Sequence, residues 1–355
     1  MKNVSLSNFA LALFVALALG WLFYIGRPIL LPIVAALISV YIMLSVSNAL
    51  HRQPLLSKVP LRLLRLTLLT AFAAVIIVLA IVTAATIREI ISVAPTYEAN
   101  IDTMVENVAV RYELDHQELW DELYAVTIGA FDLRQLFLTI LGSFRNVGVT
   151  VFLIVVYATF LMSERASFEK KLSAVFPTPE QASKVMDILG EINARISDYL
   201  VMKTMINVLL GVISYVILYA HGTDFALFWA IMIALLNYIP YVGSYIAVFF
   251  PVVLSLAQFA SLPMTISLLL FLTLAQITIS YGVEPRLIGK QVNLSPLVVL
   301  IALSVWTTLW GFSGAILAVP MTSVLAIIFY SFESTRFIAV LLANQFEEDA
   351  SSVMS

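Results

Sequence analysis

Two short polar interruptions within long apolar runs are the parts of this sequence best suited to bind a solute. The first is Asn237-Tyr-Ile-Pro-Tyr-Val-Gly243, inside the run 225–258, and the second is Trp310-Gly-Phe-Ser-Gly314, inside the run 296–330. Proline removes a backbone N–H donor, and glycine tolerates conformations that end a helix. The N–H and C=O groups freed there can hydrogen-bond a polar molecule, so the chemistry they predict is binding.

Asn237 is the polar side chain at these interruptions for which we expect a transport role. An amide buried at membrane depth without partners costs several kcal/mol, so Asn237 should face a cavity or a hydrogen-bond partner. The alternative is a hydrogen bond to the freed backbone beside it. We expect Pro240, Gly243, Gly311 and Gly314 to shape the unwound turns rather than to contact solute through side chains.

Four further polar residues lie in or next to apolar stretches. Glu284 and Arg286 flank Pro285 at the end of an expected helix. They could pair with each other, or with another element as a gate, or form an interfacial charge pair without consequence. Asn207 and Gln276 lie inside expected helices, and we predict that they bridge helices by hydrogen bonds rather than contact solute.

The composition restricts the class of protein. Hydrophobic residues make up 61% of the chain and charged residues 12%, which is far from the balance of a globular domain and predicts a membrane protein. There is no basic block to bind nucleic acid, and no cysteine. The histidines (His51, His116 and His221) show no ligand spacing, and no nucleophile with a base or phosphate loop is visible. We therefore expect no metal, no cofactor and no enzymatic activity.

The segment 1–87 is predicted to hold three transmembrane helices, at about 6–25, 28–47 and 66–87. The first run has the length of a membrane span and no cleavage site after it, so we expect a retained helix rather than a signal peptide. The loop 48–65 contains Arg and Lys without one acidic residue, which is typical of cytoplasmic loops. Both termini are therefore expected in the cytoplasm.

The segment 88–146 has the opposite character, with ten Asp and Glu against four Arg over 88–145, and is expected outside as an amphipathic helical segment. A fourth transmembrane helix follows at 147–162. The segment 163–203 is predicted to be a cytoplasmic amphipathic helix with Thr178 as its N-cap. The last segment, 337–355, is expected to be a cytoplasmic tail.

The segment 204–336 is the expected transport core, with two broken hairpins at 225–260 and 296–332. The first arm of the first hairpin has about 12 residues, which cover roughly 18 Å of a hydrocarbon core about 30 Å thick. A shift of 71 positions places Gly243 on Gly314 and Pro240 on Gly311, which is a weak internal repeat. One helix lies between the hairpins, so they should be inverted, an arrangement found in secondary transporters. Full crossings, or packed helices that are only kinked, are the alternatives.

The predicted fold class is therefore an all-α polytopic membrane protein. It has about six full transmembrane helices, two broken or re-entrant helical hairpins in inverted arrangement, and an amphipathic external helical segment. The lipid bilayer and a small polar solute are the expected partners.

Four segments resemble signature segments of the autoinducer-2 exporter family of permeases. They are 237–243, 284–289, 294–296 and 314–320, and the similarity extends through 196–204 and the hydropathy profile over nearly the whole chain. The resemblance implies a multi-pass bacterial inner-membrane protein that exports the quorum-sensing furanone autoinducer-2 or a related small polar solute. It also implies a homo-oligomer, with a pentamer as the expected form. Together, motifs and resemblance give these substrate-path or gating residues: Asn237, Pro240, Gly243, Glu284, Arg286, Gly311, Gly314 and Pro320.

Two other functions stay open at this point. Some members of the family resemble sodium or lithium/proton antiporters. Proton-driven carriers often place a carboxylate deep in the membrane, whereas Asp224 and Glu284 are expected near helix ends, which favours a neutral solute. The third reading is a non-transporting membrane scaffold that binds a partner through the acidic external segment.

Overall fold

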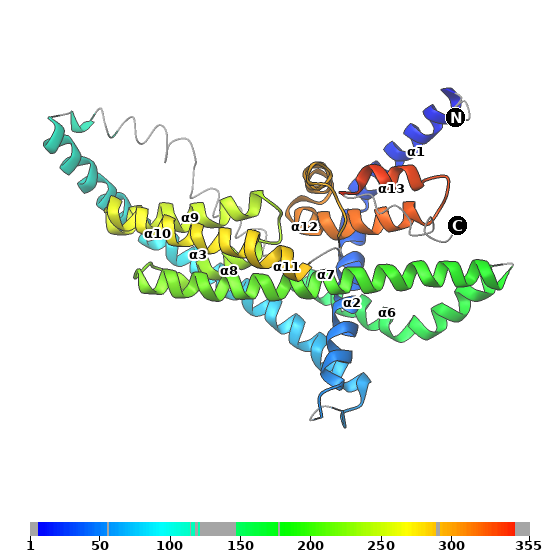
Figure 1. Cartoon of the computed structure of the whole chain (residues 1–355). Coiled ribbons are helices and arrows are strands. Elements are labelled where there is room, and N and C mark those ends of the chain that lie inside the picture. The colour runs from blue at the N-terminus through cyan, green and yellow to red at the C-terminus, as the bar shows by residue number, and fades with distance from the viewer. Residues whose placement is uncertain are drawn as a thin grey trace. The chain divides into compact units, whose positions relative to one another are not determined.

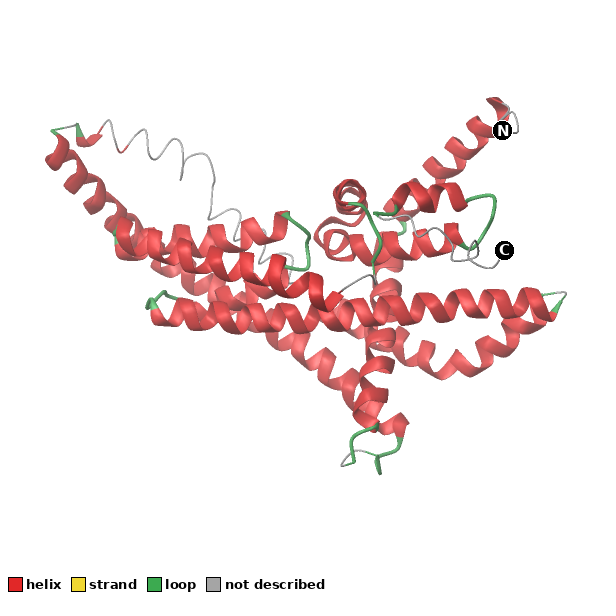
Figure 2. Ribbon diagram, viewed as in Figure 1, coloured by secondary structure: helices red, strands yellow, loops and turns green. Residues whose placement is uncertain are grey.

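The computed structural model describes residues 6–54, 57–113, 115–117, 120, 147–176, 178–288 and 292–344. Every regular element within these ranges is a helix (Figure 2). Seven helical stretches among them are long and apolar enough to span a bilayer, judged by length and composition. The predicted fold class, an all-α polytopic membrane protein, is confirmed.

The elements are labelled in Figure 1. In chain order they are α1 (Leu6–Ile25), α2 (Arg27–His51), α3 (Leu61–Tyr112), α6 (Val147–Val175), α7 (Pro179–Ala220), α8 (Ala226–Leu236), α9 (Val242–Phe259), α10 (Leu262–Ile277), the π-helix η2 (Thr278–Val283), α11 (Glu284–Ile288), α12 (Pro296–Tyr330) and α13 (Arg336–Leu342).

Helix α3 is much longer than the sequence predicted. The expected transmembrane helix ended near residue 87 and was followed by a separate amphipathic helix around 101–112, but α3 runs through both as one helix of 52 residues. Pro95 is the only strong helix breaker between them, and a single proline bends a long helix more often than it ends it. The fall in hydropathy near residue 88 therefore does not coincide with a helix end.

Helix α7 likewise crosses a predicted boundary, because its 42 residues join the amphipathic segment 163–203 to the first apolar residues of the segment 204–336. Its start is as predicted, because the Thr178 hydroxyl accepts a hydrogen bond from the Gln181 backbone N–H at 3.4 Å. Helix α6 also continues beyond the expected end at residue 162, to Val175.

The chain forms two compact units that do not follow the predicted segment boundaries. Unit 1 contains the described residues within 1–69, 152–201 and 288–355, and unit 2 those within 70–151 and 202–287. Unit 1 therefore holds α12, and unit 2 holds α8, α9 and α10. Each unit contains one of the two predicted helix interruptions.

The core of unit 1 forms around the N-terminal part of α7. Ile192, Ile196, Tyr199 and Leu200 pack with Val319 and Ile327 of α12, and partly buried residues of α2 complete the cluster. The Ser197 hydroxyl donates a hydrogen bond to the Tyr41 carbonyl of α2 at 3.1 Å. The apolar stripe of the predicted amphipathic helix is thus the side that α7 buries against α2 and α12.

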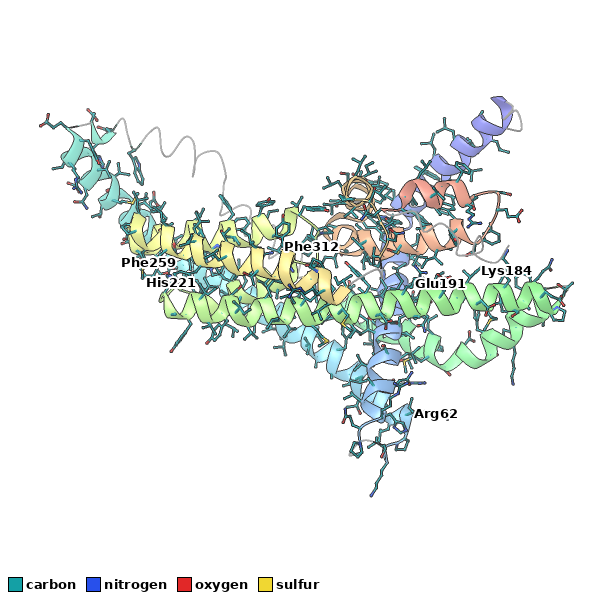
Figure 3. All side chains as sticks on the ribbon, viewed as in Figure 1. Arg62, Lys184, Glu191, His221, Phe259 and Phe312 are labelled. Atoms are coloured by element: carbon teal, nitrogen blue, oxygen red, sulfur yellow. The ribbon has the colours of Figure 1, made fainter. Side chains whose placement is uncertain are left out.

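In unit 2, α9 packs against both α8 and α10 (Figure 1). One end of this group is held by polar contacts. Tyr97 of α3 donates a hydrogen bond from its hydroxyl to Asp224 at 2.8 Å, and the backbone N–H of Asp224 donates to Gln258 of α9. Figure 3 labels Phe259 and His221 at this end. Asp224 is exposed and already has partners here.

Candidate functional site

The helix interruption in unit 2 is a reversal of the chain between α8 and α9. Helix α8 has 11 residues, which cover about 17 Å and cannot cross the hydrocarbon core. Tyr241 has a φ of 60° and a ψ of −66°, outside the helical region, and the Val242 N–H bonds the Pro240 carbonyl at 2.7 Å. A Cβ atom on Gly243 would lie 1.9 Å from the Leu236 carbonyl oxygen. Only glycine allows the two arms to meet this closely.

The interruption in unit 1 lies within α12, at Gly311, whose φ is 63° and ψ is −143°. The Trp306 indole N–H donates a hydrogen bond to the Thr322 hydroxyl at 3.0 Å. In a straight helix these residues, 16 positions apart, would be separated by about 24 Å. The two arms of α12 therefore fold back on each other as a hairpin, and the helix is not merely kinked.

The two hairpins share a backbone arrangement. A Cβ atom on Gly314 would lie 1.9 Å from the Trp306 carbonyl oxygen, the same distance as for Gly243 and Leu236. The nearest side-chain atom in each hairpin is the Cβ of the residue four positions before the glycine, at 3.0 Å for Ile239 and 3.1 Å for Trp310. The internal repeat at a shift of 71 positions thus aligns the closing glycines of two hairpins. The turns themselves differ, because the contacted carbonyl lies seven residues before Gly243 and eight before Gly314, and the residue with positive φ is Tyr241 in one turn and Gly311 in the other.

Around the unit 2 hairpin, three carboxamide side chains form a line of hydrogen bonds. The Asn237 Nδ2 donates to Asn207 Oδ1 of α7 at 2.8 Å, and Gln276 Nε2 of α10 donates to Asn237 Oδ1 at 2.7 Å. The Ser244 hydroxyl of α9 also donates to Asn237 Oδ1, at 3.2 Å. We call Asn207, Asn237 and Gln276 the amide chain. It connects α7, the hairpin turn and α10.

Each end of the amide chain carries a polar atom that the protein leaves unpaired. Asn207 Nδ2 and Gln276 Oε1 are buried and have no hydrogen-bond partner among the described residues. The exposed fractions of the two residues are 2% and 7%. More than about 90% of buried polar groups in proteins are paired, so these two are exceptions that need a reason. We call them the open amide atoms.

A buried ion pair lies one helical turn from the amide chain. Lys203 Nζ is 2.5 Å from Glu284 Oε1, and their side chains are 5% and 25% exposed. Lys203 precedes Asn207 by four residues and therefore shares its face of α7. Next to Lys203, the Thr204 hydroxyl lies 2.7 Å from the Tyr238 hydroxyl of the hairpin turn.

Lys203 was not among the site residues predicted from the sequence. The available signal was its position within 196–204, as the last charged residue before a segment, 204–283, whose only formal charge is Asp224. Its partner is 81 positions away, so only the folded chain shows the pair.

A π-helix separates Gln276 from Glu284. In a regular α-helix, residues eight positions apart point in directions about 80° apart. The wider turn of η2, over Thr278–Val283, rotates the chain less per residue and brings Glu284 closer to the face that carries Gln276. Single π-turns inside α-helices are uncommon and frequently mark functional sites.

The other predicted site residues are placed as follows. Pro240 lies in the unit 2 turn, and Pro320 is buried in the second arm of α12. Arg286 is exposed, and no ion pair joins it to Glu284 in the described chain. Gly289, the last residue of the segment 284–289, lies outside the described residues. The structure therefore gathers Asn207, Asn237, Pro240, Gly243, Gln276 and Glu284 in unit 2, and holds Gly311, Gly314 and Pro320 in unit 1.

The unit 1 hairpin has aromatic surroundings. The rings of Phe23, Trp306 and Trp310 lie within 6.2 Å of one another, measured between centroids. The Trp310 indole N–H donates to the Phe23 carbonyl of α1 at 3.0 Å, and the Trp306 indole bonds Thr322. Both indole donors are thus paired.

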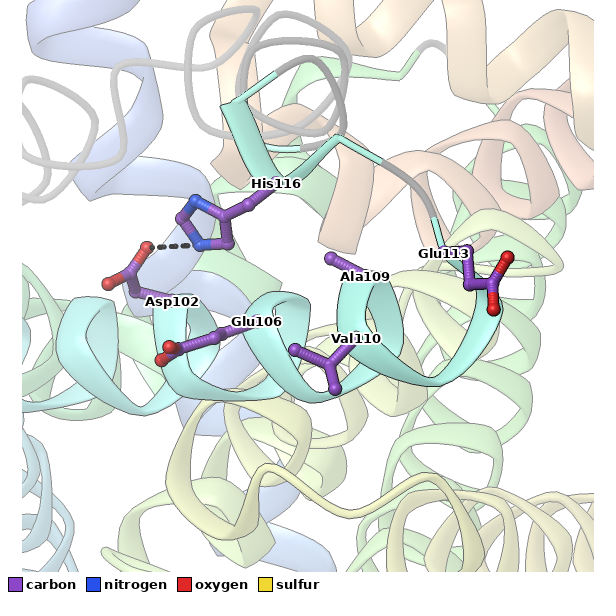
Figure 4. Close-up of a pocket in the computed structure, with 6 residues that line it drawn as sticks. All are labelled: Asp102, Glu106, Ala109, Val110, Glu113 and His116. Carbon is purple, nitrogen blue, oxygen red and sulfur yellow. Dashed lines mark ion pairs between the residues drawn. The ribbon is translucent and has the colours of Figure 1, made fainter.

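An open cavity of about 620 Å³ lies along the C-terminal end of α3 (Figure 4). Its lining includes Asp102, Glu106, Glu113 and His116, and the His116 ring turns toward Asp102, with Nε2 3.2 Å from the carboxylate. These side chains are exposed or half-buried, and no group within the described residues could hold a metal ion. We regard this acidic surface as secondary to the buried polar site in unit 2.

Comparison with known proteins identifies the family. The sequence profile described as "AI-2E family transporter" matches residues 11–333. A "Putative transport protein" of Borreliella burgdorferi is 33% identical over 235 residues, which is 66% of this chain and 63% of that protein. The "AI-2 transport protein TqsA" of Escherichia coli K12 is 28% identical over 205 residues, 58% of each chain.

A longer match, to "Putative transport protein BpOF4_00890" of Alkalihalophilus pseudofirmus, covers 83% of this chain and 80% of that protein at 26% identity. Against the first relatives, by contrast, the matched region is about three fifths of their length, namely 63%, 59% and 58%. Because the profile covers nearly the entire sequence and the fold is a multi-pass bundle of apolar helices, the chain belongs to the AI-2E family of membrane transporters.

Proposed function

We propose that this transporter exports a small uncharged polar solute, and that the solute is autoinducer-2 or a closely related molecule. The observation that carries the proposal is the amide chain at the unit 2 hairpin, with its two open amide atoms. The name of TqsA, an AI-2 transport protein 28% identical to this chain, supports the choice of solute.

Burial of polar groups beside the unit 2 hairpin costs free energy. A hairpin with only a structural role would avoid that cost. Backbone unwound at membrane depth is tolerated where protein buries it or where it lines a polar cavity. The two charges next to the site, Lys203 and Glu284, neutralise each other. The groups that remain for a solute are neutral amides, which suits an uncharged molecule with hydroxyl or carbonyl groups.

The cellular setting is part of the same proposal. Arg and Lys without acidic residues between 48 and 65 support a cytoplasmic position for that loop and for both termini in the bacterial inner membrane. We also propose a homo-oligomer, for which a pentamer is the expected form, on the basis of the family resemblance.

The test is release of labelled autoinducer-2 from vesicles that contain the purified protein. We expect release well above that of protein-free vesicles, and a decrease of about tenfold or more in Asn237→Leu, because every polar contact of the turn with α7 and α10 through this residue is lost. Wild-type release equal to that of protein-free vesicles would overturn the proposal.

The matched control is Asn100→Leu. Asn100 Nδ2 also donates hydrogen bonds, to the carbonyls of Ala257 and Gln258, but these are partly buried and lie at the far end of unit 2. This variant should lose stability to a similar degree and keep most of the release activity. An equal loss of release in both variants would show that the effect of Asn237 is not specific to the hairpin.

The second candidate function is sodium or lithium/proton antiport, which the half-buried carboxylate of Glu284 beside Lys203 favours. It predicts sodium- or lithium-dependent proton movement in the same vesicles, and loss of that movement in Glu284→Gln. Proton movement that is unaffected by either cation would exclude it. For a non-transporting scaffold, the acidic segment that would bind a partner is described over 88–113, 115–117 and 120, where Asp102 and Glu106 line the open cavity on α3.

A further inference from the structure

Asn237 itself has little hydrogen-bonding capacity left for a solute. A carboxamide oxygen accepts two hydrogen bonds, and Asn237 Oδ1 already accepts from Gln276 Nε2 and from the Ser244 hydroxyl. Its Nδ2 donates to Asn207 Oδ1. The residue that the sequence marked as the best candidate for solute contact is therefore engaged in holding its neighbours.

Asn207 and Gln276 are in the opposite situation. Each uses one end of its carboxamide on Asn237 and presents the other end, Nδ2 of Asn207 and Oε1 of Gln276, without a protein partner in the part of the chain described. A buried donor or acceptor left in this way destabilises the protein, and a ligand that pairs with it gains affinity by removing that cost.

We infer that Asn207 and Gln276 are the solute-contacting residues, that Asn237 is a positioning residue, and that the site selects uncharged hydroxycarbonyl compounds or polyols. This inference rests on the proposed function, because it assigns the recognition step of the same site. It reverses the prediction from sequence, in which Asn207 and Gln276 bridge helices and Asn237, facing a cavity or a hydrogen-bond partner, has the transport role.

The direction of the two contacts defines the ligand class. Asn207 Nδ2 is a donor and requires an acceptor on the solute, whereas Gln276 Oε1 is an acceptor and requires a donor. A hydroxyl group provides either, and a carbonyl provides the first. An ammonium ion has no acceptor for Asn207, and a carboxylate has no donor for Gln276. Ions of both signs therefore leave one of the two contacts unmade.

The contacts of Asn237 explain how solute binding at Asn207 and Gln276 affects the hairpin turn. Asn207 lies on α7 and Gln276 on α10, and the Asn237 side chain at the turn touches both. The open amide atoms have no access to solvent in this conformation. A solute that pairs with them reaches them when the α8–α9 turn moves, and the turn is attached to both contact residues through Asn237.

The experiment compares autoinducer-2 with analogues of it that each lack one hydroxyl or one carbonyl, in the vesicle assay described above. Wild type should release the parent molecule about tenfold faster than the analogue that lacks the hydroxyl paired with Gln276. In Gln276→Met this ratio should fall to about one, because the acceptor is gone. Asn207→Leu should remove the preference for the carbonyl in the same way.

Asn237→Leu is the variant that separates contact from positioning. It should lower the release of every compound and leave the ratios between compounds unchanged. Unchanged ratios in Gln276→Met and Asn207→Leu, or ratios that collapse only in Asn237→Leu, would overturn the assignment. If Gln276→Met does not fold, Asn207→Leu carries the test, because its predicted loss of the carbonyl preference does not depend on the acceptor at position 276.

Failure of the proposed function is visible separately. If wild-type vesicles release none of the compounds, the export proposal fails, and the assignment is then tested by thermal unfolding of the protein in detergent with each compound at millimolar concentration. At least one compound should raise the unfolding temperature of wild type and not that of Gln276→Met. No rise for wild type with any of the compounds would overturn the inference as well.

Discussion

The two hairpins share a close approach of their arms at a glycine but have different surroundings. At both Gly243 and Gly314, an added Cβ would approach a carbonyl oxygen to 1.9 Å, so the arms of each hairpin meet in the same way. In unit 2 the turn is joined to its neighbours by carboxamides, two of which keep an open atom. In unit 1 the residues near the turn are Phe23, Trp306 and Trp310, and both indole donors are paired.

The difference shows that breaking a helix does not in itself create a binding site. The turn frees backbone groups in both units, and the side chains around it decide whether polar capacity remains for a ligand. The unit 2 hairpin is therefore our candidate for solute recognition. The unit 1 hairpin is tied to α1 through the hydrogen bond from Trp310 to the Phe23 carbonyl, which is the arrangement of a structural anchor.

The largest effect should come from Gly243→Ala and Gly314→Ala. Neither glycine has room for a methyl group, because the nearest atom at 1.9 Å is backbone and cannot rotate away. We expect each substitution to destabilise the protein by more than about 3 kcal/mol and to reduce the yield of folded protein. Thermal unfolding and size-exclusion chromatography in detergent measure this.

Gly190→Ala is the control for these two substitutions, since nothing lies within 4 Å of the added Cβ on α7. Alanine is a better helix former than glycine by about 1 kcal/mol, so this variant should be neutral or slightly stabilised. A mild phenotype for one of the two hairpin glycines and a severe one for the other would break the equivalence of the two turns.

The next effect concerns the ion pair beside the unit 2 hairpin, for which the unit 1 hairpin has no counterpart among the described residues. Lys203→Met leaves the half-buried Glu284 carboxylate without its partner and should destabilise the protein by about 3 kcal/mol. The double variant Lys203→Met/Glu284→Gln should recover a large part of that loss. Unfolding temperatures of the single and double variants form the test, and additive losses would argue against a coupled pair.

The smallest effect should come from the unit 1 hairpin. Thr322→Val removes the acceptor of the Trp306 indole and should reduce the free energy of unfolding by about 1 kcal/mol while solute release stays close to wild type. A decrease in release as large as that of Asn237→Leu would mean that both hairpins take part in recognition. The proposed division between them would then be wrong.

The sequence was sufficient to predict the hairpins. Pro240, Gly243, Gly311 and Gly314 interrupt apolar runs whose first arms are too short to cross the membrane, and length against bilayer thickness is a strong constraint. It was not sufficient for the ends of α3 and α7. Hydropathy changes where a helix leaves the apolar region, but a helix continues in water as long as its residues permit it.

The hydrogen-bond and ion-pair partners within the site could not be predicted from the sequence either. Asn207 and Gln276 were recognised as polar residues in apolar helices, yet their common partner, Asn237, lies 30 and 39 positions away. The distinction between an engaged amide and an open one depends on side-chain rotamers and helix packing. The same is true of Lys203, whose role became visible only with Glu284 in place.

The π-helix η2 allows the helix that follows it to rotate relative to α10. Its turn contains one residue more than an α-helical turn, so a return of Thr278–Val283 to regular pitch would rotate the helix beyond it by about 100°. Such a rotation would carry Glu284 away from Lys203 while Gln276, on the near side, kept its place. One extra residue in a single turn is thus enough to separate the charged contact from the neutral one without bending or unfolding the helix.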